Sequence, residues 1–201
     1  LRLVGSEMCI RDRSYLERFF EENQEDYAYY FLNHCLNKEE KMTNALVKHP
    51  EKLADIHKMS ATMPALIQEI TQMYETLYGI SFTQDVHLIV GIYGSNAYTH
   101  LQFNPEVTFC LEKLSAEPDH LRVIIAHEFG HATQNLLSMK AGIDWSVVNW
   151  NSPYTWLLQE GCATYFSTKV VDASPDIYFA YERDVKWLAF CEENERVIIK
   201  K

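Results

Sequence analysis

Two histidines and a glutamate occur within one helical turn as His127-Glu128-Phe129-Gly130-His131. Residues four positions apart on a helix project from the same face, so both imidazoles can reach one metal ion. Zinc binds imidazole nitrogens at about 2 Å. Glu128 lies beside the two ligands, where its carboxylate can take a proton from a water on the metal. The pattern therefore predicts a metal-dependent hydrolytic centre.

Catalytic zinc usually takes three protein ligands, so a third is expected elsewhere in the chain. A helix is predicted from Ser152-Pro153, a capping residue followed by proline, and it carries Glu160. At helical period, the face around Glu160 is apolar and includes Trp156, Leu157, Ala163 and Val170. A bare carboxylate on a buried face would cost several kcal/mol, and coordination to a cation would offset that cost. We therefore predict His127, His131 and Glu160 as zinc ligands.

The residues around these ligands predict how the two helices pack. The run from Leu121 to Ile125 is largely apolar and indicates a buried histidine helix, where ionisable side chains need partners. Gly161 and Ala163 are expected to let the Glu160 helix approach another helix closely. The alternatives are that Glu160 is a surface carboxylate, or pairs with a lysine or arginine, and that the histidine motif arose by chance.

A histidine motif followed by a glutamate on a second helix resembles the gluzincins, the thermolysin-like clan of zinc peptidases. More narrowly, His127–His131 and Leu158–Ala163 resemble the predicted zinc-dependent peptidases of the domain-of-unknown-function 2268 type. Those proteins carry a histidine motif, a spacer of similar size and a Glu-Gly-x-Ala helix. The resemblance covers about residues 119 to 171. It implies a zincin-like fold, Zn2+ as cofactor and a peptide or protein substrate.

One residue departs from the thermolysin-like pattern. Those enzymes place an aspartate four residues after the third ligand, where it orients a ligand histidine, whereas this chain has Thr164. A hydroxyl accepts an imidazole N–H bond more weakly than a carboxylate does. Thr164 is a candidate for orienting a ligand histidine, and Asp144 and Asp172 are the alternatives.

The oxyanion of a tetrahedral intermediate needs a hydrogen-bond donor besides the metal. By residue type, the candidates are Tyr165 on the Glu160 helix, and Tyr178 and Tyr181 on the helix after it. His120 is a further alternative. The chain has 12 tyrosines, so core packing is the competing interpretation for each tyrosine.

Related enzymes bind a peptide substrate as an added strand at a sheet edge. The strand near Val107–Leu111 immediately precedes the histidine helix and is expected to be that edge. Asn96-Ala97 resembles the Asn-Ala pair with which thermolysin-like enzymes hold the substrate backbone. A simple turn is the alternative interpretation of this pair.

The rest of the pattern predicts an α+β fold that is mainly helical, with a small sheet before the histidine helix. Residues 14 to 78 are helical in character, with Gly79 as a C-cap. Residues 86–93 and 106–111 have the composition of strands and are separated by turn signals. Further helices are predicted from Pro118, from Pro153, and from Pro175 toward Val197.

Residues 3–13 resemble a translated sequencing adapter, so we expect residues 1–13 to be foreign to the natural protein. A genuine N-terminal tail is the alternative. Residues 14–201 are then expected to form a single zincin-like domain that is truncated at the N-terminus. Truncation at the C-terminus as well is an open alternative.

Composition disfavours several classes of partner. A net charge of −10 argues against nucleic acid and against anionic membrane surfaces, which both require clustered lysine and arginine. No apolar run approaches the roughly 18 residues that a membrane span needs. Apart from Cys9, the cysteines form no C-x-x-C pair and are interpreted as buried free thiols, which favours a reducing, cytoplasmic compartment. Two disulfides in a secreted protein are the alternative.

Three functions of different kinds fit the sequence. The first is a zinc peptidase, and the second is a catalytically degenerate zinc-binding module with a regulatory or interaction role. The third is a helical interaction protein in which the histidine motif is a coincidence. Glu128 favours the first, because a purely structural zinc site has no use for a general base.

Overall fold

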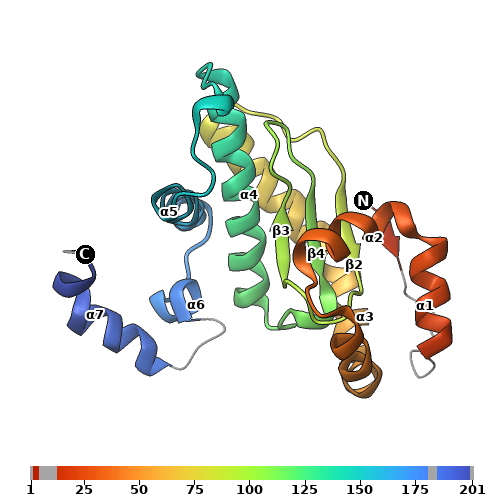
Figure 1. The fold of residues 1–201 in the computed structure, drawn as a ribbon. Coiled ribbons are helices and arrows are strands. Elements are labelled where there is room, and N and C mark those ends of the chain that lie inside the picture. Colours follow the sequence, from red (N-terminus) through yellow and green to blue (C-terminus); the bar gives the residue numbers. More distant parts are fainter. Residues whose placement is uncertain (1, 5–12, 181–184, 200–201) are drawn as a thin grey trace.

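Most of the chain is helical, and the helices surround one small mixed sheet. The computed structural model describes residues 2–4, 13–180 and 185–199 (Figure 1). The helical elements are α1 (Arg13–Glu22), α2 (Gln24–Tyr29), the π-helix η1 (Tyr30–His34), α3 (Lys38–Tyr78), the 3-10 turn η2 (Leu111–Lys113), α4 (Pro118–Lys140), the 3-10 turn η3 (Trp145–Val147), α5 (Pro153–Val170), α6 (Pro175–Ala180) and α7 (Val185–Ile199). The strands are β1 (Arg2–Val4), β2 (Val86–Ile89), β3 (Ala97–Thr99) and β4 (Val107–Cys110). The predicted α+β fold, mainly helical with a small sheet, is confirmed.

The strand order places β3 at an edge of the sheet. The order is β1-β2-β4-β3, with β1, β2 and β4 parallel and β3 antiparallel to β4. Tyr98 of β3 lies opposite Thr108 of β4, and Leu88 of β2 lies opposite Phe109. The expectation that the strand near Val107–Leu111 forms the open edge is wrong, because β4 pairs with a neighbour on each side.

The opposite edge of the sheet is formed by β1, which belongs to the segment expected to be foreign. Arg2 lies opposite His87 of β2, and Val4 lies opposite Ile89. This pairing is at the far side of the sheet from β3. It does not test the adapter interpretation, which stays a prediction.

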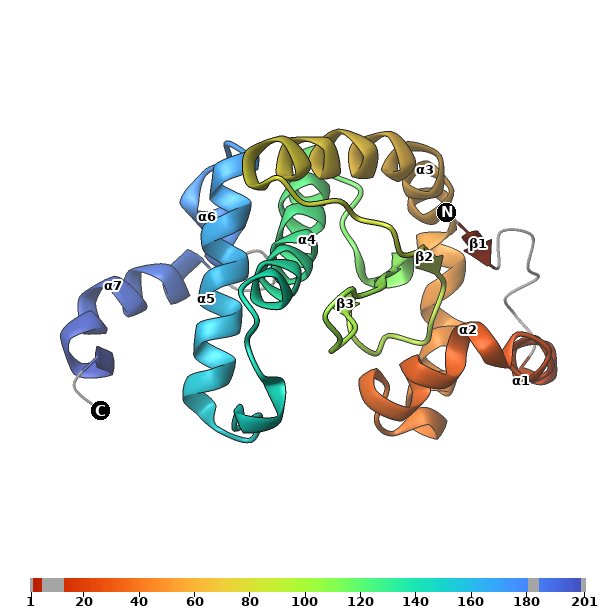
Figure 2. The same cartoon turned by 90° about the horizontal axis from the view of Figure 1, so that it is seen from above.

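Helices cover both faces of the sheet, so the described residues form two hydrophobic cores. Figure 2 shows α4 on one side of the strands and α1 and α2 on the other. Leu88 and Phe109 face the core shared with α3 and α4, whereas Ile89, Tyr98 and Cys110 face the core shared with α1, α2 and η1. Neighbouring residues divide between the two cores because successive side chains of a strand point to opposite faces.

The predicted helix ends are mostly confirmed. Pro118 lies in the first turn of α4, and the Ser152 side chain accepts the Tyr154 N–H at the start of α5. Gly79 ends α3 in the left-handed region, with a φ of 60°. The segment predicted as one helix from Pro175 is described as two helices, α6 and α7, and residues 181–184 lie outside the described residues.

A buried carboxylate holds the loop that leads from β2 toward β3. The two oxygens of Glu112 accept the N–H of Gly91 at 2.9 Å and of Tyr93 at 3.0 Å. The Tyr30 hydroxyl accepts the N–H of Ile92 and of Gly94, both at 2.9 Å. Because these four N–H groups have partners, the loop keeps one path and fixes where β3 begins.

We expect Glu112 to make stability depend on pH. Burial raises its pKa from the ordinary value of 4.5 to about 7. The folded protein therefore keeps a proton here that the unfolded chain has already lost between these two pH values. The free energy of unfolding should fall as the pH rises through this window, by up to roughly 3 kcal/mol.

Urea denaturation at several pH values between about 4.5 and 7 would measure this effect. The matched variant is Glu112→Gln, which carries no charge at any pH and should lose less stability over the same interval. An equal loss in the two proteins would show that Glu112 does not cause the pH dependence.

Two chain-wide expectations concern membranes and cysteines. Across the part of the chain that the structure describes, no helix combines the length and apolar character needed to cross a bilayer. Cys35 and Cys110 are buried free thiols, as expected, whereas the free thiols of Cys162 and Cys191 are partly exposed. The compartment in which the protein works stays a prediction.

Candidate metal centre

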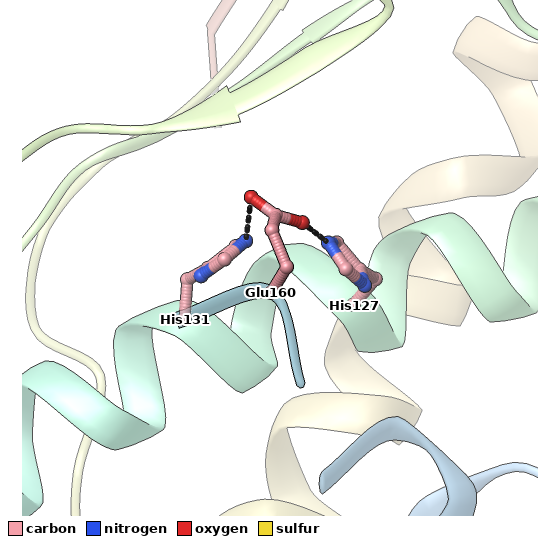
Figure 3. A group of neighbouring side chains, drawn as sticks. All are labelled: His127, His131 and Glu160. Atoms are coloured by element: carbon pink, nitrogen blue, oxygen red, sulfur yellow. Dashed lines mark ion pairs between the residues drawn. The ribbon is translucent and has the colours of Figure 1, made fainter. Parts of the chain in front are cut away.

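Helices α4 and α5 bring the three predicted ligands together. Figure 3 shows both imidazoles projecting from α4 toward the carboxylate of Glu160. His127 Nε2 lies 3.2 Å from Glu160 Oε2, and His131 Nε2 lies 3.6 Å from Glu160 Oε1. The ligand atoms of all three residues lie within 4.8 Å of one another. Ligand atoms on a tetrahedral zinc ion are roughly 3.4 Å apart, so the group fits one ion after small side-chain movements.

Gly130 sets the distance between the two ligand helices. A Cβ atom at this position would lie 2.6 Å from the Ala163 carbonyl oxygen and 2.9 Å from the Ala163 Cα. A Cβ atom at Gly161 would meet nothing within 4 Å. The expectation that Gly161 allows the close approach is therefore wrong, and Gly130 takes that role opposite the fully buried Ala163.

The expected burial of Glu160 is also wrong. Its side chain is 57% exposed, and Trp156 and Leu157 on the same helix are exposed as well. Only the later part of this face is covered, from Ala163 to Val170, because α5 meets α4 there. Glu160 lies one turn earlier, where its exposed side chain lines the cleft. Its candidacy as a ligand therefore depends on the two imidazoles and not on burial.

The three side chains shift one another's pKa values. Burial lowers the pKa of His127. Its hydrogen bond to Glu160 and the charge of Glu128 raise this pKa, and together they outweigh burial, so the net shift is upward. The bond with His127 lowers the pKa of Glu160. Burial lowers the pKa of His131 to about 4, and a positive charge on His127 adds to this shift. These shifts describe a His127–Glu160 ion pair, and a divalent cation would replace its proton.

Glu128 faces the edge strand of the sheet. Its side chain is buried, and the Thr99 hydroxyl lies 2.9 Å from both its Oε2 atom and its carbonyl oxygen. Burial raises the pKa of Glu128 to about 7. A carboxylate with a pKa near neutrality suits a group that takes up and returns a proton at pH 7. No local sequence signal predicts the Thr99 contact, which joins positions 29 residues apart.

These groups line one cleft of about 640 Å³. One side is formed by α4 and α5, the base by β3 and its flanking residues, and the other side by α2 and η1. Asn96 and Ala97 both line this cleft, and the Asn96 Oδ1 atom accepts the Ala97 N–H at 2.8 Å. The predicted Asn-Ala pair therefore lies at the start of the edge strand, beside the candidate ligands His127, His131 and Glu160, which we call the metal group.

The candidate oxyanion donors do not gather at this cleft. Tyr165 is exposed and lines a separate depression formed by α5 alone. Tyr178 packs against the core, and its hydroxyl donates to the Val171 carbonyl oxygen. His120 lines another surface pocket, away from the histidine motif. Tyr181 lies outside the described residues, so its role stays a prediction.

The candidates for orienting a ligand histidine have other partners or lie at an exposed position. Thr164 accepts a hydrogen bond from Ser167 through its carbonyl oxygen, at 2.7 Å. The Asp144 carboxylate accepts the N–H and hydroxyl of Ser146 and caps η3. Asp172 is exposed after the end of α5. Within the described ranges, no hydrogen bond or ion pair joins these three side chains to the ligand histidines.

No protein-family model matches the chain, and comparisons with curated proteins and with solved structures found no match. The functional interpretation therefore depends on residue types and geometry. Two imidazoles and a carboxylate that can hold a divalent cation lie beside a buried carboxylate and an open strand edge.

Proposed function

We propose that the chain is a zinc-dependent peptidase that hydrolyses peptide bonds through a metal-activated water. The observation that carries the proposal is the convergence of His127, His131 and Glu160 from two helices. Two imidazoles and one carboxylate are the ligand set of thermolysin-like catalytic zinc sites, which keep a position open for water or substrate. Imidazole nitrogens favour zinc over magnesium and calcium, which prefer oxygen ligands. The resemblance to gluzincins points the same way.

The chain's own residues supply the proton transfers. Bound zinc would contribute Lewis acidity, which lowers the pKa of a water to about 7 and polarises the scissile carbonyl. Glu128 takes a proton from the attacking water and returns one to the leaving amine nitrogen as the C–N bond breaks. The Thr99 hydroxyl bonds to the Glu128 carboxylate, so a residue of the edge strand itself fixes the position of the general base.

The free edge of β3 offers a place for an extended substrate. The Asn96 carbonyl oxygen accepts the N–H of Cys110 in β4, and the His100 N–H donates to the carbonyl oxygen of Glu106, which precedes β4. In an antiparallel ladder, the backbone groups of the alternate residues Ala97 and Thr99 then point to the opposite edge, where the Asn96 side chain already accepts the Ala97 N–H. No other strand among the described residues occupies that edge. A peptide can therefore add there by backbone hydrogen bonds, next to Glu128.

Metal content and cleavage test this proposal. Mass spectrometry of the purified chain should find about one zinc ion per chain. A mixture of peptides should be cleaved by this protein, and a chelator should stop cleavage until zinc is restored. Zinc without any cleavage would instead favour the regulatory or binding module. A chain that takes up no zinc would favour the helical interaction protein.

Thr99→Val should slow the proposed reaction. Valine keeps the shape of threonine but removes the hydroxyl bonded to a charged group, so we expect kcat to fall about tenfold or more with little change in KM. Thr99→Ser should restore most of the rate. Thr133→Val is a matched control, because it removes another buried hydroxyl from the same region, one that donates to the Phe129 carbonyl. Equal kcat values for Thr99→Val and the wild type would exclude this role for Thr99.

A further inference from the structure

Two stacked pairs of rings, contributed by α2, η1, β3 and the residue after β3, border the cleft opposite α4 and α5. We call Tyr29, His34, Tyr98 and His100 the ring wall. The rings of His34 and Tyr98 stack with centroids 3.7 Å apart, and those of Tyr29 and His100 stack with centroids 4.0 Å apart. The Tyr29 and Tyr98 centroids are 5.8 Å apart, which joins the two pairs. All four residues line the same cleft as the metal group, and Tyr98 is the most buried of them, with 6% of its surface exposed.

Both imidazoles of the ring wall are neutral at pH 7. Burial lowers the pKa of His34 to about 4, and burial also lowers the pKa of His100. The Nδ1 atom of His34 lies 3.3 Å from the Ser95 hydroxyl, which fixes the orientation of the ring. Two neutral imidazoles and two phenols therefore border the cleft. Planar uncharged rings of this kind interact well with another aromatic ring.

Side-chain alternation along β3 separates the ring wall from the metal group. Thr99 points toward α4 and contacts Glu128, whereas its neighbours Tyr98 and His100 stack on rings of α2 and η1. The side chains of a peptide added to the edge of β3 alternate in the same way and lie beside those of β3 on each face. When one substrate residue faces Glu128, the residue next to it places its side chain toward the ring wall.

We infer that the ring wall is a substrate subsite that binds an aromatic side chain, in the residue next to the one that faces Glu128. The substrate class is therefore an extended peptide with Phe, Tyr or Trp at this position. The inference rests on the proposed function for the bond that is cut, although aromatic binding can be measured without any cleavage. The competing interpretation is that the four rings only fasten α2 and η1 to β3.

Binding to a chain that cannot turn over tests the subsite directly. Peptides blocked at both ends, with Phe, Leu, Ala or Asp at one internal position, would be titrated into zinc-loaded Glu128→Gln. We expect the Phe peptide to bind about tenfold more tightly than the Ala peptide, and the Asp peptide to bind least. Tyr29→Leu and His34→Leu, added singly to this protein, keep apolar volume but remove a ring. Each should reduce the advantage of the Phe peptide over the Ala peptide to about twofold or less.

Phe31→Leu is the matched control. Phe31 lies in η1 between the two varied residues and packs on Phe20 and Tyr30, but it does not line the cleft. It should keep the full preference for the Phe peptide. Circular dichroism would confirm that each variant is folded. Nuclear Overhauser effects between the bound peptide's Phe ring and the ring wall would give a measurement that needs no ring-wall variant.

Cleavage of the same peptides by the wild type separates the two proposals. Aromatic preference in binding without any cleavage would leave the ring wall as a subsite and overturn the peptidase. Cleavage without aromatic preference, or a preference that survives in both ring-wall variants, would overturn the subsite and leave the peptidase. Failure of every peptide to bind or be cleaved would overturn both.

Discussion

Glu128→Gln should bind zinc like the wild type and lose hydrolysis, with kcat lower by about 10² to 10⁴-fold. The amide has nearly the shape of the carboxylate and can still accept the Thr99 hydrogen bond, but it cannot take a proton from water. Glu128 is not one of the three proposed ligand residues, so the proposed metal site is unchanged. Zinc content and peptide hydrolysis, measured on the same preparation, test the prediction.

The wild-type chain purified in parallel is the control for zinc content, and thermal unfolding would show that the variant is folded. Hydrolysis by Glu128→Gln at the wild-type rate would rule out Glu128 as the general base. Loss of zinc together with activity would instead show that the variant disturbs the ligands.

Glu160→Ala should lose zinc and, with it, all hydrolysis. Loss of an outer partner of a ligand costs 10–100-fold in metal affinity, so removal of a ligand should cost about 100-fold or more. The fold should survive, because the Glu160 side chain is 57% exposed and an exposed ion pair contributes at most about 1 kcal/mol. Zinc titration against a competing chelator, with thermal unfolding of the metal-free protein, measures both effects.

Asp172→Asn is the matched control for this change. It removes one negative charge from an exposed position just after α5 and leaves the ligand group intact. Its zinc affinity should equal that of the wild type. Wild-type affinity in Glu160→Ala would show that another residue, or none, completes the metal group.

Features with a local cause were predictable from the sequence. Proline in the first turn and a serine that caps the backbone mark the starts of α4 and α5. The spacing of His127 and His131 places both imidazoles on one face, since a helical turn is nearly four residues. The mainly helical α+β fold follows from long helical segments around two short apolar strands.

Features that depend on how the elements pack were not predictable. The burial of Glu160 was predicted from its helical face, but the part of α5 that is covered depends on where α5 meets α4. Strand order decides which edge is open, and β3 has only three residues, too few for a recognisable pattern of alternation. The Thr99 contact and the ring wall join residues distant in the sequence, so neither has a local signature.

Gly130 gives the histidine motif a requirement that coordination chemistry does not explain. Both proposed ligand histidines belong to α4, whereas the proposed third ligand belongs to α5, and the backbones of the two helices touch at Gly130 and Ala163. A side chain at position 130 would push α4 and α5 apart and move the Glu160 carboxylate away from the imidazoles, although all three proposed ligand residues would be unchanged. Homologous chains that keep all three ligands but have a bulky residue at this position would have to cross these helices differently or recruit a carboxylate from another segment.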